Sequence, residues 1–185
     1  MLTASADTGT DFYKGKSVTY IISAGAGGGY DTYGRLVAEF MQRVLPGSTF
    51  VVRNMPGAGH LIGANALYAS KPDGLTIGSF STGLINNQIS KNSKANFDLA
   101  NMSWIGKAAS EPRVVLIAAQ SPVKTFEEFM ALTTPLNFGA SGLGSAPYLE
   151  MLMLSNTLKL PIRILSGYSG SGDQLAMRRG EIGDT

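Results

Sequence analysis

Three glycine-rich loops are the segments of this sequence whose composition could do chemistry. They are 24–31 (Ala-Gly-Ala-Gly-Gly-Gly-Tyr-Asp), 141–147 (Ser-Gly-Leu-Gly-Ser-Ala-Pro) and 166–172 (Ser-Gly-Tyr-Ser-Gly-Ser-Gly). Each follows a predicted strand and precedes a predicted helix, where the first helical N–H groups lack intrahelical partners and the helix dipole places partial positive charge. Such a junction can hold an anion without Lys or Arg, and glycine lets the ligand approach the backbone. The sequence therefore predicts an anion site built from backbone N–H groups.

The elements that must position these loops alternate between strands and helices. Apolar runs predict strands at 18–23, 49–53, 76–80, 104–107, 114–118, 137–140 and 162–165. Helical spacing and capping signals predict helices at 31–45, 61–69, 147–158 and 173–179, with a further helix opening at the Thr125 to Glu128 capping box. The polar stretch 86–100 is predicted to be a surface loop with one short helical turn.

This alternation indicates βαβ units, a mostly parallel sheet and hence the α/β class, with a right-handed doubly wound start. In open sheets of this kind, ligands bind at the carboxyl ends of the strands. The helix at 31–45 is predicted to be amphipathic, because six apolar residues form one stripe: Tyr33, Leu36, Val37, Phe40, Met41 and Val44.

Composition narrows the function classes. Charged residues make up 15% of the chain and the formal net charge is +2, so general electrostatic attraction to nucleic acid or to a membrane surface is not expected. The chain has no apolar run long enough to span a bilayer, and residues 1–14 contain no apolar stretch of the signal-peptide type. The absence of cysteine excludes disulfides, thiolate chemistry and cysteine-ligated zinc.

The first loop has two other interpretations besides an anion site. The glycines could simply make tight turns. A dinucleotide site is the other alternative, but its third glycine would fall at Tyr30, and no acidic residue ends the second strand. That strand ends at Arg53-Asn54, which would suit the 2′-phosphate of NADP, so an NADP-dependent Rossmann-like enzyme remains the alternative function.

No catalytic, metal or cofactor site is predicted. The chain has one histidine, His60, which we interpret as a solvated residue of a glycine-rich turn. Asp31 has two interpretations that can both hold: an N-cap accepting an N–H from the following turn, and a ligand-facing acceptor. Tyr30 and Tyr168 are interpreted either as loop-packing aromatics or as walls of a pocket.

Several motifs occur together in a familiar order. Loop 24–31 is followed by Arg35-Leu36, by Val-Arg-Asn-Met-Pro-Gly-Ala-Gly at 52–59, by Pro-Asp-Gly at 72–74, by Gly-Ala-Ser-Gly-Leu-Gly-Ser-Ala-Pro at 139–147 and by Gly-Glu-Ile at 180–182. With these motifs in register from about residue 16 onward, the chain resembles the substrate-binding receptors of tripartite tricarboxylate transporters, the Bug family.

The resemblance implies a periplasmic, non-enzymatic receptor with a two-lobed, type II periplasmic-binding-protein-like fold and Rossmann-like lobes. Such receptors close over a small carboxylate and deliver it to a membrane permease; a noncatalytic solute sensor would use the same cleft. Residues 1–15 would be an N-terminal extension, 16–113 the first lobe and 114–185 part of the second. Carried onto this chain, the ligand-binding residues are Gly28, Gly29, Tyr30, Asp31, Ser81, Thr82, Asn86, Ser141, Gly142, Gly144, Ser145, Ala146, Tyr168 and Ser169.

This chain departs from the family pattern in three ways. Receptors of the family are longer, so we expect a truncated second lobe, exposed apolar surface and self-association of such a fragment. Pro147-Tyr148 stands where the family commonly has a Pro-His pair. The third loop reads Ser-Gly-Tyr-Ser-Gly where a Pro-Tyr-Lys-Gly-Gly run is common. These changes leave open which carboxylate or other solute would be bound.

Overall fold

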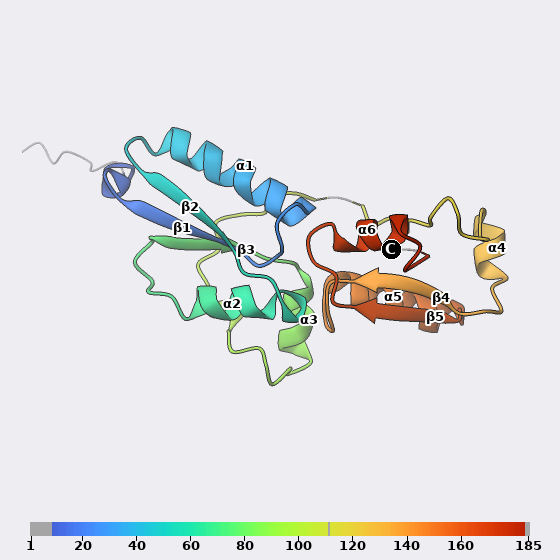
Figure 1. The fold of residues 1–185 in the computed structure, drawn as a ribbon. Helices are drawn as coiled ribbons and strands as arrows, with labels where there is room; N and C mark the ends of the chain where they lie inside the picture. Colours follow the sequence, from blue (N-terminus) through green and yellow to red (C-terminus); the bar gives the residue numbers. More distant parts are fainter. Residues whose placement is uncertain (1–8, 111, 184–185) are drawn as a thin grey trace, which may run out of the picture.

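Two separate parallel sheets organise the chain (Figure 1). The structure is a computed structural model that describes residues 9–110 and 112–183. The first sheet has the strand order β2-β1-β3 and the second the order β4-β5. The strands are β1 Ser17–Ile22, β2 Thr49–Asn54, β3 Thr76–Ser79, β4 Leu136–Ala140 and β5 Ile162–Ser166.

Helices alternate with these strands, as the sequence predicts. The α-helices are α1 Gly29–Val44, α2 Leu61–Tyr68, α3 Gly83–Ile89, α4 Phe126–Met130, α5 Ala146–Leu158 and α6 Gly172–Arg178. Among the described residues, the short 3-10 helix η1 Asp11–Tyr13 precedes β1, and two others, η2 Ala58–His60 and η3 Leu99–Asn101, lie in the connections. The α/β class and the parallel pairing are therefore confirmed.

The first lobe is built around β1. This strand pairs in parallel with β2, from Ser17 opposite Thr49 onward, and with β3 on its other edge. Val18, Tyr20, Ile21 and Ile22 are all buried, because helices α1 and α2 cover opposite faces of the sheet (Figure 1). The doubly wound start is confirmed.

Helix α1 contacts the sheet mainly through small residues, and of its predicted apolar stripe Val37 packs against the buried cluster of Tyr20, Ile22 and Ala38. Gly34 and Ala38 are buried, and a Cβ at Gly34 would lie 2.6 Å from Cδ1 of Ile22. The stripe is largely exposed, with Phe40 at 52% and Val44 at 66% of full exposure. A helix with small residues on one face approaches a sheet more closely on that face, and the larger side chains are left to one side.

The second lobe has a core between its sheet and α5. Phe138 on β4 is fully buried and packs with Val123, Phe129 and Leu160. The predicted capping box at the start of α4 is confirmed, because the Glu128 N–H donates to Oγ1 of Thr125 at 3.2 Å and the Thr125 N–H donates back to Oε2 of Glu128 at 3.2 Å.

The connection between the two sheets differs from the prediction. Residues 104–107 and 114–118 are not strands: they are irregular, apart from an isolated bridge at Ile117. Ile105 and Val114 are 76% and 71% exposed, so these apolar residues join no sheet among the described residues. Helix α3 overlaps the start of the stretch 86–100, which was predicted to be a loop with one short helical turn. The predicted lobe boundary at 113/114 falls within this connection and stays a prediction.

Candidate ligand-binding site

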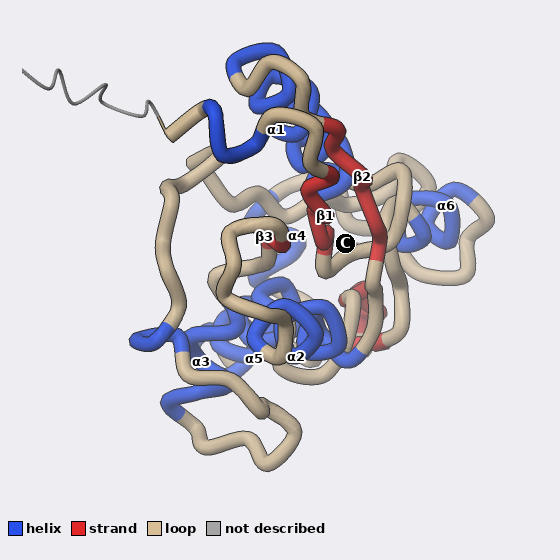
Figure 2. The backbone as a smooth tube through the Cα atoms, turned by 90° about the vertical axis from the view of Figure 1, so that its left-hand side faces the viewer, coloured by secondary structure: helices blue, strands red, loops and turns tan. Residues whose placement is uncertain are grey.

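The three glycine loops lie where the two lobes contact each other. Segments 24–31, 57–60 and 81–87 of the first lobe meet segments 141–146 and 168–172 of the second lobe along one surface, which we call the interlobe seam. Helix α3 of the first lobe lies beside α5 of the second, as the two views agree (Figures 1 and 2). The seam runs along the carboxyl ends of β1 and β3, where an α/β sheet is expected to bind ligands.

Asp31 holds the first loop in shape. Its carboxylate is buried and accepts three hydrogen bonds, from the Gly27 N–H at 3.0 Å to Oδ2, and from Arg35 Nε and Asn54 Nδ2 at 2.9 Å each to Oδ1. Burial opposes ionisation, but the hydrogen bonds from Arg35, Gly27 and Asn54 and the positive charge of Arg35 outweigh it, so the pKa of Asp31 is lowered.

The N-cap interpretation of Asp31 is wrong. The N-cap of α1 is Gly28, and Asp31 lies in the first turn of the helix. Its carboxylate accepts from Gly27, which precedes the helix, and not from the turn that follows. This bond folds the loop back onto the start of α1 and leaves Gly29 and Tyr30 exposed beside it.

Tyr30 contacts a residue that the sequence did not mark as part of the site. Its ring meets His60 edge-on, with the ring centroids 4.9 Å apart. His60 is buried, so the expectation of a solvated turn residue is wrong. Burial lowers the pKa of His60, although a hydrogen bond to the Ser23 backbone acts in the opposite direction. The His60 side chain is therefore neutral at pH 7. Its backbone is left-handed, with a φ of +78°, and it is the N-cap of α2.

The second loop starts α5. Ser145 is fully buried and is the N-cap: its Oγ accepts from the Tyr148 N–H at 3.4 Å, and its own N–H donates to the Gly142 carbonyl at 3.1 Å. Ser141 is partly buried and Ala146 is buried at the first position of the helix. The Ser145 hydroxyl accepts from the backbone and keeps an O–H to donate.

Glycines let the second loop touch the first lobe backbone to backbone. A Cβ on Gly142 would lie 2.6 Å from the Gly59 nitrogen, and a Cβ on Gly59 would lie 2.8 Å from the Leu143 carbonyl oxygen. A Cβ on Gly83 would lie 2.7 Å from the Ala146 nitrogen. Distances below 3.0 Å leave no room for a side chain, so glycine is required at these points of the seam.

The third loop meets the first loop in the same manner. A Cβ on Gly28 would lie 2.8 Å from the Gly170 carbonyl oxygen, and one on Gly25 would lie 3.2 Å from Cβ of Ser169. Tyr168 is partly buried, and a Cβ on Gly139 of β4 would lie 3.3 Å from its ring. This position favours the loop-packing interpretation of Tyr168.

The loop after β3 also reaches the seam. Ser81 is buried and its Oγ accepts from the Gly83 N–H at 3.1 Å, while Thr82 is exposed at the N-cap of α3. Asn86 is exposed on α3, whereas the next residue, Asn87, is buried and donates to the Gly144 carbonyl at 3.0 Å. Sequence reasoning missed Asn87 and His60, because their partners are distant in the chain.

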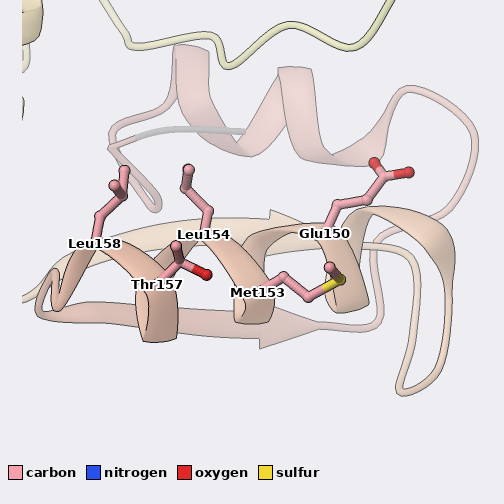
Figure 3. A pocket seen from close by; sticks show the side chains of 5 residues that line it. All are labelled: Glu150, Met153, Leu154, Thr157 and Leu158. Carbon is pink, nitrogen blue, oxygen red and sulfur yellow. The ribbon is translucent and has the colours of Figure 1, made fainter.

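Two open grooves lie away from the glycine loops. One, of about 340 Å³, is lined only by residues of α5, namely Glu150, Met153, Leu154, Thr157 and Leu158 (Figure 3). Glu150 pairs there with Arg113 at 3.1 Å, which holds this arginine at α5. The other, of about 490 Å³, lies beside α3 and Trp104. Neither groove gathers polar groups as the seam does.

The described residues show neither a metal cluster nor a spanning helix. Within 9–110 and 112–183, no group of three or more His, Asp or Glu side chains could hold a metal ion. In the same ranges, no helix is long and apolar enough to cross a membrane.

Comparison with known sequences identifies relatives of this chain. A UPF0065 protein of Agrobacterium vitis, from the TAR-I ttuE-ttuC' intergenic region, is 30% identical over 166 residues, which are 88% of this chain and 47% of that protein. A UPF0065 protein of Bordetella pertussis is 25% identical over 98% of this chain and 57% of its own length. The chain thus spans about half the length of the curated relatives it matches.

Comparison with solved structures establishes the fold. The periplasmic binding protein BugD matches 91% of this chain and 57% of its own with a TM-score of 0.72 at 22% identity. MatC from Rhodopseudomonas palustris with bound malate matches 91% and 59% with a TM-score of 0.70 at 24% identity. A structure described as a periplasmic transporter matches 93% and 59% with a TM-score of 0.84.

The two-lobed periplasmic-binding-protein fold predicted from the sequence is confirmed by these likenesses. The model of the tripartite tricarboxylate transporter family receptor matches residues 34–183, which is most of the chain and includes the second and third glycine loops. The chain belongs to the family of tripartite tricarboxylate transporter receptors.

Proposed function

We propose that this chain is the ligand-capturing part of a solute receptor that holds a small carboxylate between its two lobes. The observation that carries the proposal is the interlobe seam, where the first, second and third glycine loops and the loop after β3 come together. Helices α1 and α5 both begin there, with 16 and 13 residues behind their N-termini. Their unpaired N–H groups and dipoles favour a bound anion.

A carboxylate suits the polar groups that this seam offers. The seam offers backbone N–H groups and the hydroxyls of Ser81, Ser141 and Ser145, which match the oxygens of a carboxylate. Hydrogen bonds to a charged group stabilise by about 1.5 to 3 kcal/mol each, so a few from each lobe would favour lobe contact in the bound state. Among the solved structures of similar fold, one holds malate and another adipate.

The seam does not support the alternative of an NADP-dependent enzyme. Asn54, at the end of β2 where a ribose-binding side chain would be expected, already donates to Asp31 and to the Ala24 carbonyl. We assign no catalytic residue. Family membership supports a receptor in the periplasm that delivers its solute to a membrane permease, and we propose that location and partner for the whole protein.

The test is isothermal calorimetry of the full-length receptor with a panel of mono-, di- and tricarboxylates, their amides, and NADP. We expect one carboxylate class to bind without chemical change and its amides not to bind. Binding of NADP alone, or binding of an amide as tightly as its acid, would contradict the proposal.

A matched pair of variants places the binding event at the seam. Ser145→Ala removes the hydroxyl at the N-terminus of α5, and Ser155→Ala removes a hydroxyl that donates to the Leu160 carbonyl at the other end of the same helix. We expect Ser145→Ala to weaken carboxylate binding about tenfold, which corresponds to one charge-assisted hydrogen bond. Ser155→Ala should leave the affinity unchanged. Equal affinity in both variants would remove Ser145 from the site.

A further inference from the structure

One buried side chain crosses the interlobe seam with a hydrogen bond. Asn87 on α3 of the first lobe is 3% exposed, and its Nδ2 donates to the Gly144 carbonyl of the second lobe at 3.0 Å. The same nitrogen donates to the Gly83 carbonyl, one turn earlier on α3, at 3.1 Å. The amide thus joins the first turn of α3 to the loop that starts α5.

The surroundings fix the orientation of the Asn87 amide. Its Oδ1 accepts from Nδ2 of Asn92 at 2.7 Å. If the amide were flipped, its oxygen would face the carbonyls of Gly83 and Gly144, and its nitrogen would face the Asn92 donor. Both N–H groups and the oxygen therefore have partners in one orientation only. A buried amide with every group paired is costly to disturb.

The acceptor of this bond controls the proposed binding loop. Gly144 directly precedes Ser145, the N-cap of α5, and has a φ of +78°. A Cβ at Gly144 would lie 2.8 Å from Oδ1 of Asn87, so the two residues pack without space between them. Gly83, the other acceptor, lies against Ala146 at the first position of α5. Holding Gly144 therefore also fixes where the first N–H groups of α5 lie relative to the first lobe.

We propose that Asn87 is a positioning residue that latches the two lobes together, by holding the Gly144 peptide and with it the N-terminus of α5. The bond lies within the seam. Its role in ligand capture rests on the proposed function, but the latch itself does not. With the latch removed, the lobes separate more often and a bound ligand leaves faster.

The chain is suited to a direct measurement of lobe separation. It contains no cysteine, so two introduced cysteines would be the only thiols for spin labels. Val44, at the end of α1, and Met153, on α5, are 66% and 68% exposed and lie on helices of different lobes. Pulsed electron paramagnetic resonance on the 185-residue chain then reports the distance between the lobes without ligand.

Three variants separate a latch from a general loss of stability. Asn87→Ala removes the interlobe bond. Asn65→Ala is the matched control, because Asn65 also bridges two backbone groups with its amide, donating to Lys94 and accepting from Asn96, but within the first lobe. Asn92→Ala keeps Asn87 but removes the side chain that orients it, together with the acceptor of the exposed Lys94 N–H; Asn92 is partly exposed, so this variant is the milder one.

We expect one short distance in the parent chain and in Asn65→Ala. In Asn87→Ala the population at longer distance should rise about tenfold, as loss of one buried hydrogen bond would give, and in Asn92→Ala it should rise less. If Asn87→Ala does not fold, Asn92→Ala decides. An unchanged distance in the folded Asn87 or Asn92 variant, or the same change in Asn65→Ala, overturns the latch.

Ligand kinetics form the second measurement. For the carboxylate found by calorimetry, we expect Asn87→Ala to raise the dissociation rate of the full-length receptor and Asn65→Ala to leave it unchanged. Failure of every carboxylate to bind would refute the proposed function and leave the distance measurement valid. Unchanged distances with intact binding would refute the latch and leave the receptor assignment standing.

Discussion

Replacement of Asp31 by alanine should destabilise the chain by about 3 kcal/mol at pH 7. The estimate counts two part-buried hydrogen bonds that lose their charged acceptor, from Gly27 and Asn54, at about 1.5 kcal/mol each. The ion pair with Arg35 adds little, because the arginine side chain is 52% exposed and water can replace its partner. For a chain of this length, this loss lowers the melting temperature by about 6 to 12 °C.

The effect of Asp31 should also depend on pH in a definite direction. The pKa of Asp31 is lowered from its ordinary value of 3.8, so its contribution to the free energy of unfolding is fully present above that value. The contribution disappears as the pH falls through the lower pKa of the folded state. Melting curves followed by circular dichroism from pH 7 to pH 2 should therefore show the difference between Asp31→Ala and the parent chain shrinking at the acid end.

Asp73→Ala is the matched control for Asp31→Ala. Asp73 accepts one hydrogen bond, from the Leu75 N–H at 2.9 Å, in an exposed turn. Its removal should cost less than about 1 kcal/mol. Equal melting temperatures for Asp31→Ala and the parent chain at pH 7 would refute the idea that this carboxylate holds the first loop. So would a difference that does not change with pH.

Three other predictions test separate parts of the structure. Thr125→Ala removes half of the capping box on α4 and should cost about 1 kcal/mol in chemical denaturation, whereas an unchanged midpoint would show that the box contributes nothing. Cysteines introduced together at Gly25 and Ser169 should form a disulfide on mild oxidation, because a Cβ at position 25 would lie 3.2 Å from that of Ser169 and a small shift of either loop brings the pair to the separation of about 3.5 Å at which disulfides form. Persistent free thiols by mass spectrometry would argue against contact between the first and third loops. Burial lowers the pKa of His60 from its ordinary value of 6.5, so the stability that the neutral imidazole contributes is fully present above pH 6.5 and is lost as the pH falls toward the pKa of the folded state. His60→Asn, which tolerates the left-handed backbone, should therefore make the melting temperature depend less on pH between pH 7.5 and pH 5. The same pH dependence of the melting temperature in the variant and the parent chain would contradict this account.

The sequence predicted the elements that have strong local signals. The strand at Ser17–Ile22 is shifted by one residue at both ends from its prediction, and the helix at Ala146–Leu158 begins one residue earlier than predicted, because apolar runs and glycine loops are local signals. The helix at Gly83–Ile89 was predicted only as one short turn within 86–100, because its sequence, Gly-Leu-Ile-Asn-Asn-Gln-Ile, begins with glycine and carries three residues of turn-like or polar type. Apolar content at 104–107 and 114–118 predicted strands that do not form, since a strand also needs a partner for its backbone groups.

The site was predictable as a set of loops but not as a set of contacts. Loops 24–31 and 141–146 were recognised from glycine content and from their place between strand and helix. The seam depends on contacts between residues that are far apart in the sequence, such as Asn87 with Gly144. The spacing of apolar residues along the chain does not predict such a contact. The predicted ligand-binding residues themselves, from Gly28 to Ser169, remain proposals that the calorimetry addresses.

The glycine contacts of the seam make the spacing of the lobes adjustable in steps of a single methyl group. Alanine at Gly142 would insert a Cβ where the Gly59 backbone is 2.6 Å away, and alanine at Gly83 would do the same against Ala146. Each substitution acts as a wedge of known size at a known position. Because the wedges add no charge and remove no hydroxyl, they would alter how far the lobes open with little change in what the loops recognise. A series of such variants could turn this scaffold into a graded reporter of solute concentration.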